Sequence, residues 1–520
     1  MKPGKADVSM SYTSDAILNA PDYFFDLLAM VFRSWMVHGS VTMSLLACAF
    51  LPLYKGGFKD PAKSDSYRAI AGSALLLKLF DNVILLLWGD LLKSDTLQFG
   101  FKSGSSTTQC SWLVNEVTSY FLRKGTPCLV TLLDCSKAFD MCQFSTLFVK
   151  LKGKKLPAVV LRVLIFVYEH QYAWVKWGDA KSASFGVTNG TRQGSVLSPT
   201  IFAIYIDDLI KELRSLGVGC HIGGKFFGAA GFADDIILLA PSRGAMELML
   251  KTCEEFARVN NLMFSTDPVP SRSKTKCLFM CGKTNARYPV PLQLNGVNLP
   301  WVTSATHLGH HLHQSCSMEY DTDIKRASFI ESTLEIREMF GFAQPEQILR
   351  AVHTYAGHFY GSMLWNLYGN GANKVFRAYN TCIKLIWDVP RSTHNFFVEN
   401  VLSASMPHVR QQILCQYLNF FKKLLHSDSP EVKILANIVA RDPNSVTGKN
   451  LWNLEQEFYL DPWLATPSML KSVYRQYLVP TNDEWRPPLL MELLAQRRVL
   501  LACGEDTGSI SEIIDSLCSS

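Results

Sequence analysis

Blocks of hydrophobic and polar residues predict that this 520-residue chain begins with helices and a strand. Residues 16–50 carry apolar positions at mixed helical spacing, which predicts helical structure. The segment ACAFLPLYKGG (47–57) predicts a strand that runs into a glycine turn. The segment SALLLKLFDNVILLLWGDLL (73–92) predicts a largely buried helix, and residues 107–123 predict another.

Two short β-type runs in the middle of the chain each meet aspartate. The first run, Leu129–Leu133, ends in Asp134. The second run, KFFGAAGF (225–232), leads into the pair Asp234–Asp235, and IILLA (236–240) leads away from that pair. This arrangement predicts a β-hairpin with carboxylates at its tight turn.

Helical segments at 144–170 and 199–215 lie between these strands. A strand followed by two helices and then by a strand–turn–strand unit predicts an antiparallel sheet with helices on one face. From residue 320 onward the pattern is mostly helical. The predicted fold class is therefore α+β.

Two adjacent aspartates between apolar runs require a physical explanation. Asp tolerates turn geometry, so turn preference explains one of them. Two carboxylates at the rim of a buried hairpin repel each other and lose hydration, and a divalent cation would offset both effects. If the strands are neighbours, Asp134 and Asp234 emerge at one sheet edge. They could there hold two Mg²⁺ ions about 3.5–4 Å apart, as in phosphoryl transfer. For Asp234 and Asp235 taken alone, a solvated turn explains the pair equally well.

A second pair of aspartates, Asp207 and Asp208, offers a comparison within the chain. It lies in IYIDDLIKEL (204–213), where the apolar positions recur at helical spacing. The pattern predicts that both carboxylates are solvated charges on the polar face of a helix.

Composition and charge are those of an ordinary globular protein, with 48% apolar residues, 18% charged residues and a net charge of +6. Charge alone does not identify a nucleic-acid-binding protein. The 14 cysteines form no tight framework, and the N-terminal segment has no apolar core of signal-peptide length. We therefore expect an intracellular protein that is not secreted. The 21 uncharged residues at 34–54 are broken by polar residues and Pro52, so we expect no membrane span.

One local stretch is basic. Residues 268–318 contain five Lys or Arg residues and no Asp or Glu. A strip without acidic residues beside the hairpin suits a nucleic-acid backbone, and a solvated loop is the alternative interpretation.

Three ordered segments of the chain resemble the palm motifs of reverse transcriptases, above all those of non-LTR (LINE-type) retrotransposons. These segments are LLDCSKAFD (132–140), NGTRQGSVLSPTIFAIYIDDL (189–209) and GFADDIILLA (231–240). The upstream segments LPLYKGGFKDPAKSDSYRAI (51–70) and LQFGFKSGSSTTQC (97–110) add to the resemblance, which covers residues 1–315.

The resemblance implies a role for individual residues. Asp134, Asp234 and Asp235 would be the catalytic, metal-associated carboxylates, and Phe139 would be the steric gate against a 2′-hydroxyl. The other residues implied in nucleotide binding are Lys55, Arg68, Gln193, Gly194, Lys274 and Lys276. Each also has a simpler interpretation, because Phe139 could be a core side chain and Lys55 and Arg68 could be surface charges.

The resemblance also implies a right-hand polymerase fold. Its expected parts are fingers and N-terminal helices at 1–126, a palm with a primer-grip-like hairpin at 127–315, a helical thumb-like region at 316–390, and a helical extension of unknown role at 391–520. The implied cofactor is Mg²⁺, as two ions for which Mn²⁺ could substitute. The implied partners are an RNA template, a DNA primer and dNTPs.

Two features depart from the pattern of the family. Phe232 stands where the family usually has Tyr, and Met1 falls inside the fingers region with no endonuclease domain before it. We therefore expect an N-terminally truncated reverse transcriptase. The alternatives are an inactive remnant that only binds nucleic acid, and an RNA-dependent RNA polymerase.

Overall fold

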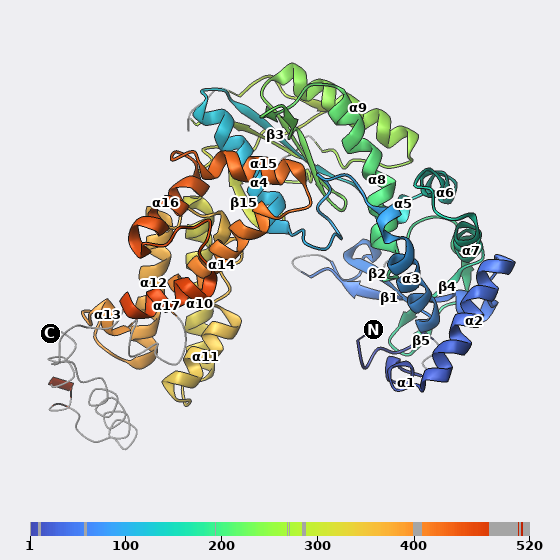
Figure 1. The fold of residues 1–520 in the computed structure, drawn as a ribbon, viewed down its shortest axis with the longest axis horizontal. Helices are drawn as coiled ribbons and strands as arrows, with labels where there is room; N and C mark the ends of the chain where they lie inside the picture. The colour runs from blue at the N-terminus through green and yellow to red at the C-terminus, as the bar shows by residue number, and fades with distance from the viewer. Residues whose placement is uncertain are drawn as a thin grey trace. The chain divides into compact units, whose positions relative to one another are not determined.

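The computed structural model describes residues 2–8, 12–56, 60–192, 194–267, 269, 271–282, 288–398, 408–477, 508 and 511–512. The chain forms two compact units (Figure 1). The first unit comprises Met1–Ser106, Leu129–Cys277 and Tyr288–Val302. The second unit comprises Thr107–Cys128, Leu278–Arg287 and Thr303–Ser520. Among the described residues, no helix has both the length and the apolar character that crossing a bilayer requires.

Helices of several lengths surround the sheets of the first unit. They are α1 (Ser14–Leu18), α2 (Asp22–His38), α3 (Leu75–Trp88), α5 (Ala138–Met141), α6 (Phe144–Gly153), α7 (Ala158–Glu169), α8 (Ser198–Ser215) and α9 (Arg243–Val259). The predicted helical segment 144–170 is thus two helices, since Pro157 lies between α6 and α7 and cannot continue α6.

One sheet of the first unit has five strands. It runs in the order β2-β1-β4-β5, and β6 also pairs with β4. The strands are β1 (Ala47–Tyr54), β2 (Tyr67–Ser73), β4 (Tyr172–Trp177), β5 (Ala180–Lys181) and β6 (Phe185–Gly186). The sequence pattern predicts only β1. Strand β1 pairs with β4, more than 100 residues away, in parallel, and a local pattern cannot predict such a pairing.

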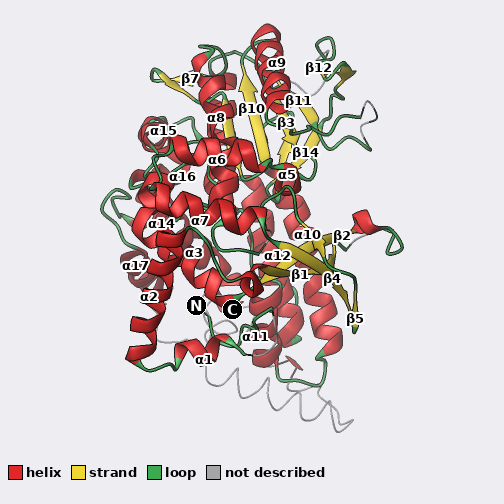
Figure 2. Ribbon diagram, turned by 90° about the vertical axis from the view of Figure 1, so that its right-hand side faces the viewer, coloured by secondary structure: helices red, strands yellow, loops and turns green. Residues whose placement is uncertain are grey.

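A second sheet runs in the order β11-β3-β10-β9, and it appears apart from the first sheet in Figure 2. Its strands are β3 (Cys128–Asp134), β9 (Ala229–Phe232), β10 (Asp235–Ala240) and β11 (Lys276–Met280). Strand β10 pairs antiparallel with both β3 and β9, which confirms the predicted antiparallel hairpin. All residues of β3 before Asp134 are buried, so both faces of this strand are covered. Helices α8 and α9 pack against each other and against β9 and β10.

Short hairpins complete the β-structure. They are β7 (His221–Ile222) with β8 (Lys225–Phe226), β12 (Gln293–Leu294) with β13 (Val297–Asn298), and β14 (Ser304–His307) with β15 (His310–His313). The resemblance implies a primer-grip-like hairpin within 127–315, and the last part of this range contains two hairpins, β12–β13 and β14–β15.

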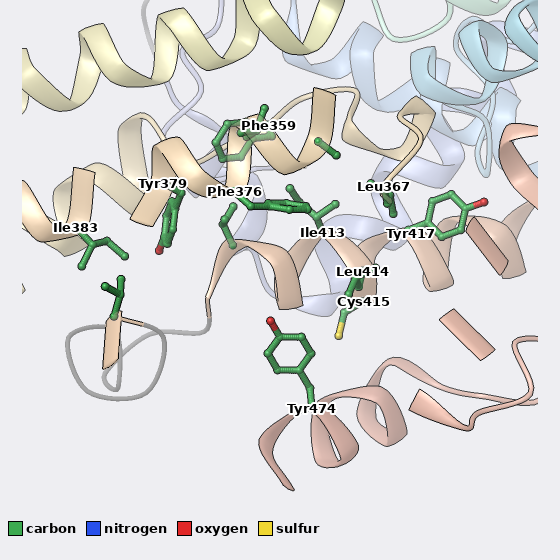
Figure 3. Packing of buried hydrophobic residues seen from close by; sticks show 14 of the residues in the cluster. Phe359, Leu367, Phe376, Tyr379, Ile383, Ile413, Leu414, Cys415, Tyr417 and Tyr474 are labelled. Atoms are coloured by element: carbon green, nitrogen blue, oxygen red, sulfur yellow. The ribbon is translucent and has the colours of Figure 1, made fainter. Parts of the chain in front are cut away.

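The second unit is mostly helical, as the sequence predicts for the chain beyond residue 320. Its helices are α4 (Thr107–Arg123), α10 (Glu319–Met339), α11 (Pro345–Tyr355), α12 (Asn370–Trp387), α13 (Asn395–Phe397), α14 (Val409–Leu425), α15 (Pro430–Ala440), α16 (Val446–Phe458) and α17 (Pro467–Tyr477). One apolar cluster contains residues of α10, α11, α12, α13, α14, α16 and α17, and Figure 3 shows side chains of α12, α14 and α17 within it. Tyr379, Phe376 and Ile413 belong to this cluster.

Helix α3 is less buried than its sequence predicts. Leu75, Phe80 and Ile84 are buried, but Leu86 and Leu87 are exposed. A helix that is apolar on every side does not reveal which side its neighbours will cover. The prediction of a largely buried helix is therefore wrong for one face.

Asp207 is not a solvated charge, so that prediction is wrong for one member of the pair. Its side chain is 0% exposed on α8 and forms ion pairs with the Nζ atoms of Lys154 at 3.1 Å and Lys211 at 2.6 Å. It also accepts a hydrogen bond from the backbone N–H of Asp95. Asp208 is 44% exposed and pairs with Lys150 at 2.8 Å. Lys211 is on the same helix, but Lys154 and the backbone of Asp95 come from other segments, and helical periodicity does not report these two contacts.

We predict that Asp207→Ala lowers the free energy of unfolding by about 1–3 kcal/mol, because it leaves the N–H of Asp95 without its acceptor and removes the anion from the ammonium groups of Lys154 and Lys211. Asp208→Ala is the matched control. It should cost less than about 1 kcal/mol, because its ion pairs are partly exposed. Urea denaturation followed by circular dichroism measures both values. Equal losses for the two variants would contradict this interpretation.

Candidate active site

Asp134 and the pair Asp234–Asp235, about 100 residues later in the sequence, lie at one edge of the second sheet. The antiparallel register of β3 and β10 sets Asp134 directly opposite Asp235. Phe232 pairs with Asp235 in the β9–β10 hairpin, so Ala233 and Asp234 form the two-residue turn between the strands. The sequence thus predicts the hairpin and its proximity to Asp134 correctly. The catalytic role of these carboxylates stays a prediction.

The proximity of the carboxylates changes their acidity. Burial raises the pKa of Asp235, and repulsion from Asp234 and Asp134 adds to this effect, so that the pKa reaches about 6. Burial also raises the pKa of Asp234, and Asp134 raises it further. Arg68 and Lys274 act in the opposite direction on Asp234 because their positive charges favour the carboxylate. The cluster therefore carries negative charge that the surrounding residues neutralise only in part.

The predicted basic residues lie at different places. The Nζ atom of Lys274 is 3.4 Å from Oδ2 of Asp134. Lys276 is the first residue of β11. Arg68 lies on β2 and is exposed, and its charge reaches Asp234. Lys55 donates from Nζ to the backbone carbonyl of Asp65 at 2.7 Å, so its ammonium group binds within the β1–β2 connection.

Phe139 lies in α5, directly after the loop that follows Asp134. Its ring stacks on Phe202 of α8 with centroids 4.2 Å apart, and the ring of Phe101 meets it edge-on at 6.1 Å. Its backbone carbonyl accepts a hydrogen bond from the N–H of Thr191 at 2.7 Å. The ring is half-buried, so it belongs to the packing of α8 and also keeps an accessible edge.

Gly194 lies in the loop before α8, and Gln193 lies outside the described residues. Gly194 has φ +119°, and a Cβ atom there would collide with the carbonyl oxygen of Ala71. Only glycine adopts this conformation readily and tolerates so close an approach to β2.

Asp81 of α3 anchors the same loop. It accepts hydrogen bonds from the Oγ of Ser195 and from the backbone N–H groups of Val196 and Leu197. Burial raises the pKa of Asp81, whereas the nearby Arg192 guanidinium lowers it.

The donor chemistry of the three aspartates fits a hard divalent cation, because all donors are carboxylate oxygens and their repulsion requires positive charge. The positions of the aspartate side chains fit such a cation less closely. Within the part of the chain that the structure describes, no group of three or more His, Cys, Asp or Glu side chains converges closely enough to hold a metal ion. The strand register places the three aspartates side by side, but their carboxylate oxygens do not converge on one point.

Two contacts at this site escape the motif-based prediction. Asp81 is the one acidic residue of the mostly apolar helix α3, and a lone carboxylate in such a segment is a signal that could have identified it. Gln98, which contacts the turn at Ala233, lies in LQFGF, where the neighbouring Gly100 gave the only local signal of a close backbone approach.

Comparisons with known proteins agree with the sequence motifs. Residues 58–312 match the family described as reverse transcriptase (RNA-dependent DNA polymerase). The Pol polyprotein of a type-1 retrotransposable element R2 from Nasonia vitripennis is 25% identical over 259 residues, which are 50% of this chain and 24% of that protein. The probable RNA-directed DNA polymerase of the X-element of Drosophila melanogaster is 27% identical over 286 residues, which are 52% of this chain and 29% of that protein.

The matched segments span less than a third of the length of these relatives. Among solved structures, telomerase from Candida albicans in complex with a fragment of telomeric RNA aligns over 85% of this chain and 68% of that chain, with a TM-score of 0.38 and 10% identity. So low a score carries no argument.

The raised pKa of Asp235 predicts a pH-dependent effect on stability. The folded protein binds a proton at Asp235 with a pKa of about 6, whereas an unfolded Asp titrates near pH 4, so the repulsion costs stability as the pH rises from 4 to 6. Without metal, Asp235→Asn should therefore melt at a higher temperature than the wild type above pH 6. This gain should vanish near pH 4.

Differential scanning fluorimetry between pH 4 and pH 8 measures this gain. The control is Asp179→Asn, an exposed aspartate in the β4–β5 turn, which should show no such gain. A gain at Asp235 that is independent of pH would contradict the electrostatic explanation.

Proposed function

We propose that this chain is an RNA-directed DNA polymerase. The premise is that residues 58–312 form a reverse transcriptase domain of the LINE type. It would extend the 3′-hydroxyl of a DNA primer along an RNA template, with dNTPs as substrates. The single observation that carries this proposal is the strand register that sets Asp134 opposite Asp235, beside Asp234.

Asp134, Asp234 and Asp235 would hold two Mg²⁺ ions, or Mn²⁺ in their place. When bound, the ions supply Lewis-acid chemistry, which acidifies the primer hydroxyl and neutralises charge on the triphosphate. Three carboxylates of partly unbalanced charge favour such cations, and Lys274 balances only part of that charge.

The other residues of the site would position the substrate. Arg68 supplies positive charge close enough to act on Asp234, which suits the triphosphate of a nucleotide. The loop at Gly194, held by Asp81 and packed on β2, would border the nucleotide and the template base. Phe139 rests on Phe202 and is therefore rigid enough to exclude a 2′-hydroxyl. Most of the catalytic effect would come from positioning and charge neutralisation.

We also propose the roles that the sequence suggests for the successive regions of the chain. Residues 1–126 would serve as fingers, 127–315 as palm and 316–390 as thumb. Lys55 would take part through the fingers, Lys276 would lie beside the path of the nucleic acid, and Gln193 would line the nucleotide pocket.

We predict that Asp134→Asn and Asp234→Asn each reduce primer extension by at least about 100-fold, because each removes charge from the cation site. An oligo-DNA primer on a homopolymer RNA with Mg²⁺ and labelled dNTP measures the incorporation. Asp208→Asn is a matched control from the other aspartate pair and should retain activity, because Asp208 lies on α8 and pairs with Lys150 of α6.

Wild-type incorporation that survives Asp234→Asn would refute the proposal. Salt-sensitive binding of primer–template without any incorporation by the wild type would support the alternative of an inactive binding protein.

We predict that Phe139→Ala increases the use of rNTPs relative to dNTPs by about 10-fold or more, because removal of the ring removes the steric clash with a 2′-hydroxyl. Competition between dNTP and rNTP in the same extension assay measures the ratio. The control is Phe101→Ala, since Phe101 meets Phe139 only edge-on. A wild-type enzyme that uses rNTPs as well as dNTPs would instead indicate an RNA polymerase.

A further inference from the structure

The turn that carries Asp234 contains an unusual backbone conformation. Ala233 has φ +60°, in the left-handed region that residues other than Gly, Asn and Asp rarely adopt. The strands on either side leave the turn only two residues, so Ala233 and Asp234 must make the whole reversal. The direction in which Asp234 and Asp235 leave the hairpin therefore depends on what holds Ala233.

The side-chain amide of Gln98 binds both the backbone N–H and the backbone carbonyl of Ala233. The Oε1 atom of Gln98 accepts a hydrogen bond from the N–H of Ala233 at 2.9 Å. The Nε2 atom donates to the carbonyl oxygen of Ala233 at 3.2 Å. Oε1 also accepts from the N–H of Gly100 at 2.9 Å, which fixes the amide group itself. The side chain is 0% exposed, so water cannot replace these bonds.

The backbone around Gln98 forms a short additional strand beside β9. The N–H of Phe99 donates to the carbonyl oxygen of Gly231 at 2.7 Å, and the N–H of Gly231 donates to that of Leu97 at 2.9 Å. Two glycines make this approach possible. A Cβ atom at Gly231 would lie 2.9 Å from Nε2 of Gln98, and one at Gly100 would collide with the backbone nitrogen of Ala233.

We propose that Gln98 is a positioning residue for the carboxylates of the active site: its amide fixes the left-handed turn at Ala233 and thereby the direction of Asp234 and Asp235. This inference rests on the proposed function, because positioning matters only if the carboxylates act on a substrate. Gln98 acts through the backbone of the turn and need not touch the nucleotide.

The chemistry of the contact explains why an amide occupies this position. Ala233 presents a donor and an acceptor to the same side chain, and among uncharged side chains of this length only glutamine offers both an acceptor and a donor. Methionine fills similar space but makes neither bond. Glutamate keeps the acceptor for the N–H groups and, when ionised, lacks the donor for the carbonyl oxygen of Ala233.

The experiment compares Gln98→Met, Gln98→Glu and a control, Gln171→Met. Gln171 is also buried in the first unit, and its side-chain amide has no hydrogen-bond partner among the described residues. Single-nucleotide extension should show that Gln98→Met lowers kcat by about 10- to 100-fold, with the KM for dNTP changed less than about threefold. Gln98→Glu should lose less, and Gln171→Met should stay within about twofold of the wild type.

A second readout does not depend on activity. Hydrogen exchange at the Ala233 amide should become at least about 10-fold faster in Gln98→Met, less so in Gln98→Glu, and unchanged in Gln171→Met. Unchanged protection of Ala233, or an unchanged kcat in Gln98→Met, would overturn the inference. If the wild type incorporates no nucleotide, the proposed function fails, while the exchange rates still decide whether Gln98 holds the turn.

Discussion

Repulsion among three carboxylates is the constraint on which this structure depends. The hydrogen bonds between β3 and β10 set Asp134 opposite Asp235, and the two-residue turn sets Asp234 beside them. The apolar residues of both strands are buried on both faces, and a slip in register would draw a carboxylate into that apolar layer. The folded chain therefore holds negative charge together, and burial together with this repulsion raises the pKa values of Asp234 and Asp235.

Two buried carboxylates elsewhere in the first unit have binding partners supplied by the protein itself. Asp207 meets two lysines and a backbone N–H, and Asp81 meets a serine, two backbone N–H groups and the field of Arg192. These groups stabilise the positions of α8 and of the loop before it. The aspartates at the sheet edge have Lys274 and Arg68 near them and retain unbalanced charge, which distinguishes them from a structural ion pair.

Local sequence patterns were sufficient to predict much of the fold. Strand β3, the hairpin at Asp234 and the helices from residue 320 onward have strong local periodicity, and the structure contains them. Strands β2 and β4 escaped prediction because β2 is short of apolar alternation and β4 pairs with a strand more than 100 residues away. The exposure of Leu86 and Leu87 escaped prediction for a related reason, because the sequence of α3 does not indicate which face its neighbours cover.

The sequence by itself determined where the carboxylates of the candidate site lie along the chain. The order of Asp134, Gly194 and the pair Asp234–Asp235 follows from motifs in which each residue type has a physical purpose. Only the tertiary structure decided the surroundings of these residues. Asp207 is buried because Lys154 and the backbone of Asp95 reach it from other segments, and Ala233 keeps its left-handed turn because Gln98, 135 positions earlier, lies against it. Such contacts depend on chain segments that meet only after folding, so local periodicity carries no record of them.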